Sequence, residues 1–357
     1  MSDIVLDRDA AIDRSSAPRE AYYTICPVYV ASNVAAELGW LEDELKRVGA
    51  KLSYLRSLAD GAGWLPHFSH RHPALFRDGG NVPSIWAHAD QARTKLLALT
   101  AAHDGGQILV RTDSDIRRVA DLAGRRIGLP RSLNERKVDW WRATAERGIE
   151  LALAVSGLTR SQVEIRDIAW PDDVAPAPAR RPSELWGRHD RDALAQNVEV
   201  GALFAGEVDA VFAAHGRSTL LERTGRVRVI EDLARHPDWT LQIANSPYAL
   251  TVSAELAAEA PDIVVAFLRA AVRAGRWINA NRSAAAEILA RVTYLPDAAG
   301  TAAAIAHTDF VPDLSPRNLA AIGIQKQFLR THGYVHGDFD IAGWADDRFL
   351  AEALATA

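Results

Sequence analysis

The sequence predicts an α/β protein built from two lobes, and three observations support this fold class. The chain has 357 residues, whereas a single hydrophobic core stops growing at roughly 250–300 residues. Strand-like and helix-like segments alternate along the first two thirds, which is typical of sheets with parallel strands. The last third, from Ala254 onward, has helical patterns separated by prolines. We therefore expect the chain to return to the first lobe and to cover it with helices.

The composition and the prolines suggest a division into three parts. Residues 1–19 are polar and form an N-terminal arm in this interpretation. The first lobe comprises residues 20–112 plus 240–357, and the second lobe comprises residues 113–239.

The first lobe opens with an aromatic and β-branched strand that Pro27 ends. The patterns predict strands at 21–26, 52–55, 94–101, 106–112 and 247–253, and helices at about 34–48 and up to about 92. Ser32 or Asn33 is a suitable cap for the first of these helices. Residues 59–83, in which glycine and proline recur, read as one long loop. A loop of that length in a compact domain is more often functional than idle.

In the second lobe, the pattern at residues 121–130 predicts the end of a helix, then a turn at glycine, then a strand that a proline terminates. The patterns that follow predict a helix at about 135–155, strands at 163–168, 208–214 and 226–230, and a Pro-rich surface loop at 170–186.

Composition and charge exclude several classes of function. The chain carries 41 basic and 46 acidic residues, so the basic excess typical of nucleic-acid binding is absent. No apolar run reaches the roughly 18–20 residues of a membrane span. Charges interrupt the first 26 residues, so we expect no secretory signal and a cytoplasmic protein. We predict no obligate protein partner, and the single cysteine, Cys26, excludes an internal disulfide.

Two segments resemble the marker segments of the type II periplasmic-binding-protein fold. They are DLAGRRIGLP at 121–130 and GEVDAVFAA at 206–214, about 80 residues apart. The segment GWLEDELKRVGAKLSYL at 39–55 resembles the nitrate, sulfonate and thiamine-precursor branch of that superfamily. The resemblance implies two lobes with a ligand cleft between them, but the fold serves receptors and enzymes alike.

A narrower resemblance lies in the first lobe. It consists of Cys26-Pro27-Val28, His67-Phe68, Arg77, Gly79-Gly80 and Pro83. This arrangement, with ten residues from the histidine to the arginine, is similar to that of the 2'-hydroxybiphenyl-2-sulfinate desulfinases. His70 and His72 stand where that family is expected to have tyrosine and glutamine, which leaves the identity of the arene open. The resemblance implies a cofactor-independent enzyme in which Cys26, His67 and Arg77 are catalytic.

The residue types fit this chemistry, although each has a plainer explanation. Cys26 ends a strand and precedes a helix N-terminus, a position that favours a thiolate, but free cysteines are often inert core residues. Arg77 offers a planar fork to two oxygens, and the Gly79 and Gly80 amides can approach an oxyanion closely. The plainer alternative is a solvated arginine beside a turn. His67 is either a general acid or base or a hydrogen-bond donor in a loop.

Two further groups leave alternatives open. His67, His70 and His72 lie within six residues and could hold zinc, but Arg71 between them is unfavourable to a cation, so we predict no metal. Five aromatic side chains could either line a pocket for an aryl ligand or simply pack in the core: Trp64, Phe68, Trp86, Trp140 and Trp141. Of these, Phe68 and Trp141 are the predicted ligand contacts.

The sequence therefore predicts a desulfinase that hydrolyses the carbon–sulfur bond of an aromatic sulfinate, giving arene and sulfite without a cofactor. Either the Cys26 thiolate attacks sulfur, or Cys26 protonates the ring carbon while His67 helps to move the proton. Gly79, Gly80, Phe68 and Trp141 are the expected substrate-binding residues. The alternative function is a non-catalytic solute-binding protein for an anionic or aromatic small molecule.

Overall fold

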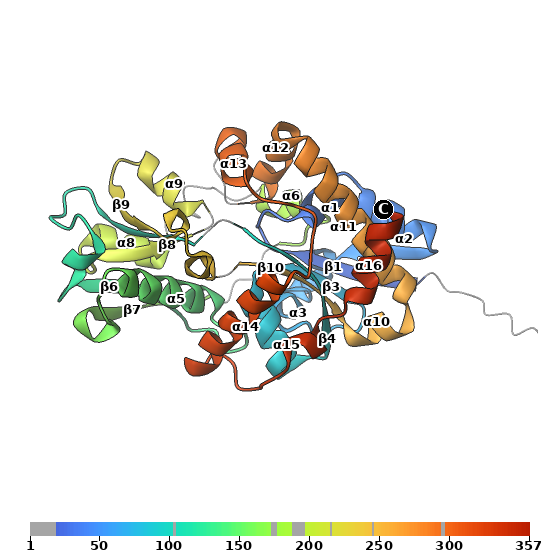
Figure 1. The fold of residues 1–357 in the computed structure, drawn as a ribbon, viewed down its shortest axis with the longest axis horizontal. Coiled ribbons are helices and arrows are strands. Elements are labelled where there is room, and N and C mark those ends of the chain that lie inside the picture. The colour runs from blue at the N-terminus through green and yellow to red at the C-terminus, as the bar shows by residue number, and fades with distance from the viewer. Residues whose placement is uncertain are drawn as a thin grey trace, which may run out of the picture.

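The computed structural model describes residues 19–102, 105–172, 177–187, 197–214, 216–244, 246–293 and 297–357. These residues form two lobes, each built on a five-stranded sheet (Figure 1). The expected N-terminal arm lies outside the described residues except for Arg19, which begins the first strand. None of the described helices is long and apolar enough to cross a membrane.

The first sheet has the order β2-β1-β3-β10-β4. Its strands are β1 (Arg19–Ile25), β2 (Ala50–Tyr54), β3 (Leu75–Gly79), β4 (Thr94–Thr100) and β10 (Tyr248–Ser253). The first three strands are parallel, but β10 runs antiparallel to both β3 and β4. The expected long loop at 59–83 is wrong in part, because β3 lies within it at the centre of the sheet.

The second sheet has the order β7-β6-β8-β5-β9. Its strands are β5 (Gln107–Arg111), β6 (Arg126–Ser132), β7 (Glu164–Trp170), β8 (Ala210–Ala213) and β9 (Val227–Asp232). Strand β5 is antiparallel to its neighbours β8 and β9, so both sheets are mixed rather than parallel. The chain thus changes sheets before residue 107, whereas the sequence-based division kept residues up to 112 in the first lobe. Pro130 does not stop β6, which continues to Ser132.

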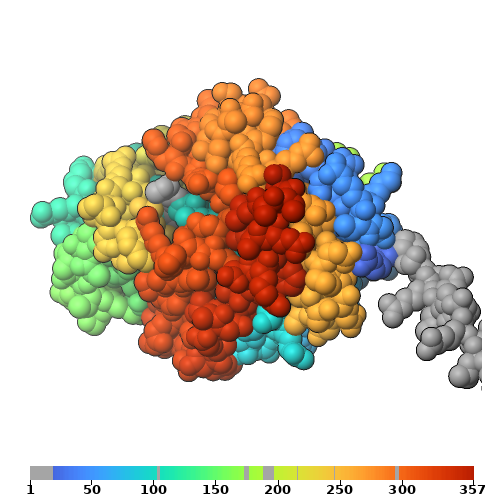
Figure 2. Space-filling model, turned by 45° about the vertical axis from the view of Figure 1, so that its right-hand side comes forward, coloured from blue at the N-terminus to red at the C-terminus, as the bar shows by residue number. Residues whose placement is uncertain are grey.

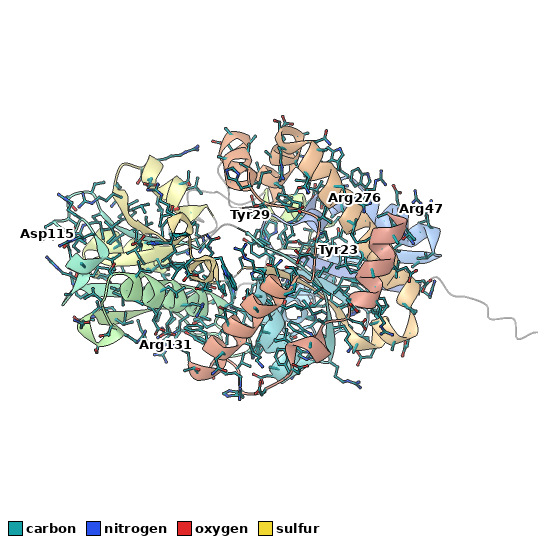
Figure 3. The ribbon with its side chains drawn as sticks, in the orientation of Figure 1. Tyr23, Tyr29, Arg47, Asp115, Arg131 and Arg276 are labelled. Carbon is teal, nitrogen blue, oxygen red and sulfur yellow. The ribbon has the colours of Figure 1, made fainter. Side chains whose placement is uncertain are left out.

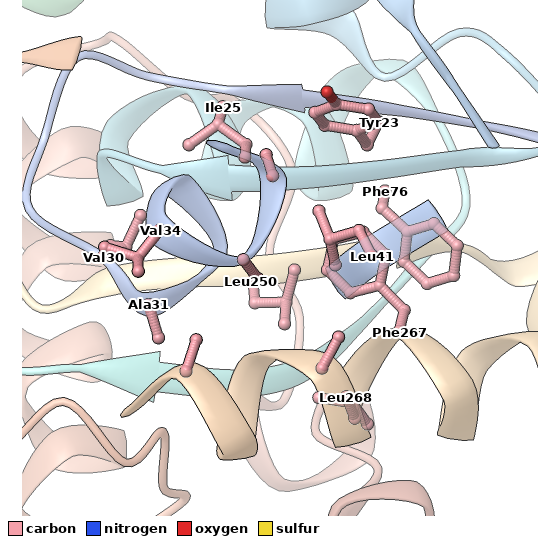
Figure 4. Close-up of a cluster of buried hydrophobic side chains, with 14 of the residues drawn as sticks. Tyr23, Ile25, Val30, Ala31, Val34, Leu41, Phe76, Leu250, Phe267 and Leu268 are labelled. Carbon is pink, nitrogen blue, oxygen red and sulfur yellow. The ribbon is translucent and has the colours of Figure 1, made fainter. Parts of the chain in front are cut away.

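Helices cover both faces of the first sheet. On one face, α11 packs against α1, α2 and α16, over a core that includes Tyr23, Ile25, Leu250 and Phe267 (Figure 4). On the other face, α4, α14 and α15 pack over Leu96. The helices of this lobe are α1 (Ala31–Glu37), α2 (Trp40–Arg47), α3 (Trp64–Ser69), α4 (Asn81–Trp86), α10 (Ala254–Glu259), α11 (Pro261–Ala280), α12 (Arg282–Val292), α13 (Ala298–Ile305), α14 (Pro316–Thr331), α15 (Ile341–Trp344) and α16 (Asp347–Thr356).

Two sequence expectations for the first lobe need correction here. The single helix expected at about 34–48 is two helices, because Gly39 adopts a left-handed conformation (φ +74°) between α1 and α2. Ser32 and Asn33 do not cap it, since α1 begins at Ala31 and both lie inside the helix.

The C-terminal segment covers the outer edge of the first sheet. Leu99 of β4 exchanges two backbone hydrogen bonds with Asp313, and Leu96 accepts one from Asp346. These pairings shield an edge strand that would otherwise expose its backbone groups. Figure 2 shows the same segment, in red, lying over the first lobe.

The second lobe holds α5 (Trp140–Val155), α8 (Val198–Ala205) and α9 (Arg217–Arg223) around its sheet. Figure 3 shows Asp115 and Arg131 on this lobe, far from Tyr23 in the first. The short helix α6 (Pro182–Trp186) contacts α1 and α12 of the first lobe, and Ser183 is hydrogen-bonded to Glu37. The C-terminal end of the expected Pro-rich loop therefore packs against the first lobe rather than on an open surface.

Candidate active site

The candidate site lies where the parallel strands of the first sheet end. Strands β1, β2 and β3 point the same way, so their carboxyl ends share one edge, which is where ligands bind in open α/β sheets. Cys26 directly follows β1, and its amide donates to the Asp78 carbonyl of β3 at 2.9 Å. This register also brings Gly79 and Gly80, which the sequence placed in a loop, to the same edge as Cys26.

The Cys26 backbone is held by the first helix. The Asn33 side-chain amide donates to the Cys26 carbonyl at 3.1 Å and to the Val28 carbonyl at 2.7 Å. The Val28 amide also donates to the Cys26 carbonyl, at 2.8 Å. Three hydrogen bonds thus fix the turn that presents the half-buried thiol.

Gly79 makes room for the sulfur. A Cβ atom at this position would lie 2.3 Å from the Cys26 Sγ and 2.5 Å from its Cβ. The φ of Gly79 is +150°, in a region that residues with a side chain rarely adopt. Only glycine therefore allows the last residue of β3 to pass so close to Cys26.

His67 contacts the thiol from helix α3. Its Nε2 lies 3.6 Å from the Cys26 Sγ, and its Nδ1 lies 2.6 Å from the Thr24 hydroxyl. Thr24 and Cys26 project from the same face of β1 because side chains alternate along a strand. Burial lowers the pKa of His67 well below its usual value, and the nearby charges of Arg56, Arg77 and Lys137 lower it further. The imidazole is therefore neutral, so a stable imidazolium–thiolate pair is unfavourable here.

Arg77 is completely buried and also reaches the thiol. Its Nη2 lies 3.4 Å from the Cys26 Sγ. Its Nε donates to the His67 carbonyl at 2.9 Å, and its Nη1 donates to the Gly80 carbonyl at 3.1 Å and to Ser84 Oγ at 2.7 Å. A guanidinium has five N–H groups, so only one of them, on Nη2, is free of these contacts. The expected open fork of Arg77 is thus reduced to a single free donor, because protein oxygens occupy the rest.

Phe68 borders this group, but Trp141 does not. The Phe68 ring packs edge-on against the His67 ring, with centroids 4.8 Å apart. Lys137, from the second lobe, places its ammonium 5.0 Å from the Phe68 ring centroid and pairs with Asp172. Trp141 instead lies in the core of the second lobe, where its indole N–H donates to Glu199 at 2.9 Å.

The other two histidines of the cluster have separate environments. His70 Nε2 lies 3.0 Å from the Leu75 carbonyl, and burial lowers the pKa of His70 to about 3. His72 Nδ1 accepts a hydrogen bond from the Ala74 amide. Within the described residues, no three histidine, cysteine, aspartate or glutamate side chains come together as metal ligands do.

Sequence reasoning missed four residues near the thiol: Thr24, Arg56, Asp78 and Lys137. Thr24 could have been found from the alternation along β1, two residues before Cys26. Arg56 could have been found from its place after a strand that is parallel to β1. Asp78 is buried and bonded to Ser32, and burial raises its pKa to about 6. Lys137 comes from the other lobe, and no local pattern signals its approach.

A separate cavity of about 240 Å³ lies where the chain crosses between the two sheets. Its lining includes Ala101, Ala102, Ser246 and Pro247 from the crossing segments and Asn318 from α14. None of the residues around Cys26 lines this cavity, so it is distinct from the candidate active site.

Comparisons with known proteins support the resemblance seen in the sequence. No family model matches the chain. The chain is 29% identical to 2'-hydroxybiphenyl-2-sulfinate desulfinases of Rhodococcus erythropolis and Rhodococcus qingshengii, over 355 aligned positions that span 93% of each chain. The resemblance to these desulfinases is thereby confirmed along nearly the whole chain, not only at its first-lobe motif.

Solved structures give the same result for the fold. A cysteine-to-serine variant of the desulfurization enzyme DSZB, in complex with biphenyl-2-sulfinic acid, matches with a TM-score of 0.74 and 25% identity, covering 96% of this chain and all of that one. The alkanesulfonate-binding protein SsuA from Xanthomonas axonopodis pv. citri, bound to MOPS, matches with a TM-score of 0.63 and 19% identity, covering 93% of this chain and all of that one. The predicted two-lobe, periplasmic-binding-protein-like α/β fold is confirmed.

Proposed function

We propose that this protein is an aryl sulfinate desulfinase that cleaves a carbon–sulfur bond with Cys26. The observation that carries the proposal is the Cys26 thiol, whose sulfur lies 3.6 Å from His67 Nε2 and 3.4 Å from Arg77 Nη2 at the ligand-binding edge of the sheet. The similarity to desulfinases over 93% of the chain supports it. The overall reaction is ArSO2⁻ + H2O → ArH + HSO3⁻.

Both mechanisms suggested by the sequence involve a thiolate at Cys26. It is the nucleophile in the first mechanism and the conjugate base left after proton transfer in the second. In the first, the thiolate attacks sulfur, the ring carbon takes a proton and leaves as arene, and water then splits the Cys–S–SO2⁻ intermediate into thiol and HSO3⁻. In the second, the thiol protonates the ring carbon, SO2 leaves and is hydrated to HSO3⁻, and the released proton restores the thiol. The guanidinium of Arg77 next to the sulfur stabilises the thiolate in either case.

His67 then has a narrower role than a conventional general base. Because its pKa is lowered well below the usual value, His67 is a weak base and does not readily keep the proton of the thiol. It serves better as a neutral group that orients the sulfur or passes on a proton without holding it. The Thr24 hydroxyl on Nδ1 fixes the imidazole ring for this purpose.

The sulfinate oxygens are proposed to meet the free Nη2 donor of Arg77 and the amides of Gly79 and Gly80. The arene is proposed to lie against Phe68, whose ring borders His67. Trp141 stays a predicted substrate contact, reached only if the second lobe contributes to the arene pocket. No cofactor is part of this proposal.

The test uses the single cysteine of the chain. Wild type should release sulfite from biphenyl-2-sulfinate, and iodoacetamide should abolish the release with one label per chain, against which the substrate protects. Cys26→Ser should bind the sulfinate in calorimetry yet release negligible sulfite, because a hydroxyl is a far weaker nucleophile and acid. Tight binding without release by wild type would contradict the proposal and favour the alternative, a solute-binding protein.

A further inference from the structure

A second arginine, Arg56, lies at the same edge of the first sheet as Cys26. It belongs to a short turn, Leu55–Ser57, that follows β2 directly. Strands β1 and β2 are parallel, with Tyr23 beside Tyr54, so the residues after each strand emerge on the same side. Arg56 thus follows β2 much as Cys26 follows β1, and its charge contributes to the depressed pKa of His67.

The Arg56 guanidinium is buried, and no carboxylate pairs with it in the part of the chain that the structure describes. The residue is 7% exposed, and its Nε and Nη1 have no hydrogen-bond partner among the described residues. Its guanidinium carbon lies 4.8 Å from the centroid of the Trp64 ring. Burial lowers the pKa of Arg56 to about 10, which reflects how unfavourable a desolvated cation without a counter-charge is.

The other cations near the thiol are already engaged. Arg77 uses four of its five N–H groups on protein atoms, one of them the Cys26 sulfur. Lys137 is paired with Asp172. If Arg77 balances the thiolate, the charge of a bound sulfinate is left for Arg56. The single N–H that Arg77 retains can meet only one sulfinate oxygen, and the Gly79 and Gly80 amides carry no charge, so a second cation beside them would strengthen the binding of the anion.

We propose that Arg56 binds the anionic head group of the ligand, so that a sulfinate, and the sulfite formed from it, lies between Arg56 and Arg77 beside Cys26. The Trp64 ring supports one face of the guanidinium and leaves its edge for the anion. The identity of the anion rests on the proposed function. The existence of an oxyanion site at Arg56 does not.

The test is calorimetric titration of wild type and Arg56→Met with three probes: sodium sulfite, benzenesulfinate and the uncharged methyl phenyl sulfone. Methionine keeps an apolar stem beside Trp64 but removes the charge. Affinity for both anions should fall roughly ten- to hundredfold, as expected for a lost charge-assisted contact, while affinity for the sulfone stays the same. Unliganded Arg56→Met should melt no lower than wild type, because the substitution removes a buried cation that has no counter-charge among the described residues.

A matched control is Arg147→Met. Arg147 is also buried, has a pKa lowered by burial to about 10 and lies over an aromatic ring, with 5.2 Å from its guanidinium carbon to the Phe328 centroid. Its Nε, however, donates to the Ile243 carbonyl, and its contacts are with Ile243 and with Phe328 of α14 rather than with the residues around Cys26. Arg147→Met should melt lower than wild type and keep its affinity for sulfite.

The outcomes separate this inference from the proposed function. If wild type binds sulfite through Arg56 but releases none from any aryl sulfinate, the desulfinase proposal fails and the anion site stands. If wild type turns over sulfinates and Arg56→Met keeps the wild-type sulfite affinity and KM, the anion site is wrong and the desulfinase proposal stands. Failure of wild type to bind sulfite at all, or a lower melting temperature of Arg56→Met with intact affinity, would also overturn the role of Arg56.

Discussion

Replacing Gly79 with alanine tests whether the position of the Cys26 sulfur depends on a missing side chain. The new Cβ would lie 2.3 Å from Sγ, whereas real Cβ contacts essentially never fall below 3.0 Å and are ordinary from 3.4 Å, so the sulfur or the strand must move by about 0.7 to 1.1 Å. The same movement would disturb the contacts of Sγ with Arg77 Nη2 (3.4 Å) and His67 Nε2 (3.6 Å).

The expected size of the effect follows from this displacement. A shift of about 1 Å in a reacting group can lower the rate about 100-fold, so kcat/KM for sulfite release should fall by about that factor. Overpacking and the strained φ should together lower the free energy of unfolding by about 1–3 kcal/mol. The assays are sulfite release, the rate of iodoacetamide labelling of Cys26, and urea denaturation.

Gly39→Ala is the matched control. Gly39 has a left-handed φ of +74°, but a Cβ there would meet nothing within 4 Å. This variant should lose about 1–2 kcal/mol of stability from backbone strain and keep full activity. If Gly79→Ala lost the same stability as Gly39→Ala and kept its labelling rate and turnover, the sulfur would not depend on Gly79 and the reasoning would be refuted.

Two further predictions concern groups that flank the thiol. Thr24→Val removes the hydroxyl that contacts His67 Nδ1, so kcat should fall about tenfold with KM unchanged. The buried nitrogen left without a partner should lower the free energy of unfolding by about 1–3 kcal/mol. An unchanged kcat would show that the imidazole ring needs no such support. The pKa of Asp78 is raised to about 6, so between about pH 4 and 6 the folded protein keeps a proton that the unfolded chain has lost. The free energy of unfolding should therefore fall by about 3 kcal/mol as the pH rises from about 4 to 6. Asp78→Asn should remove this slope in urea titrations, and a slope that persists would assign it to another group.

The sequence could predict the parts of the site that depend on local order. Cys26 ends an aromatic and β-branched strand, and the His67, Arg77 and Gly79-Gly80 pattern carried the resemblance to the desulfinases. The strand at β3 was missed because its sequence, LFRDG, includes two charges, and charged residues rarely occupy a buried central strand. Here both are buried because protein atoms accept from four of the five N–H groups of Arg77 and because Asp78 is bonded to Ser32.

The remaining misses depend on distances in space that no local pattern encodes. The free donors of Arg77 could not be counted before its partners Gly80 and Ser84 were known. Arg56 was not singled out from the sequence, because only the folded structure shows that its Nε and Nη1 have no hydrogen-bond partner among the described residues. Lys137 approaches Phe68 from the other lobe, more than 60 residues away in the sequence.

The interior place of β10 in the first sheet has a consequence for synthesis of the chain. This strand fills the gap between β3 and β4, with Thr251 beside Arg77, yet it is made only after the whole second lobe. Until residue 253 has left the ribosome, β3 keeps one edge open, and such an edge invites pairing with other chains. The site around Cys26 therefore forms late. The first sheet can be completed only after the second lobe has been synthesised.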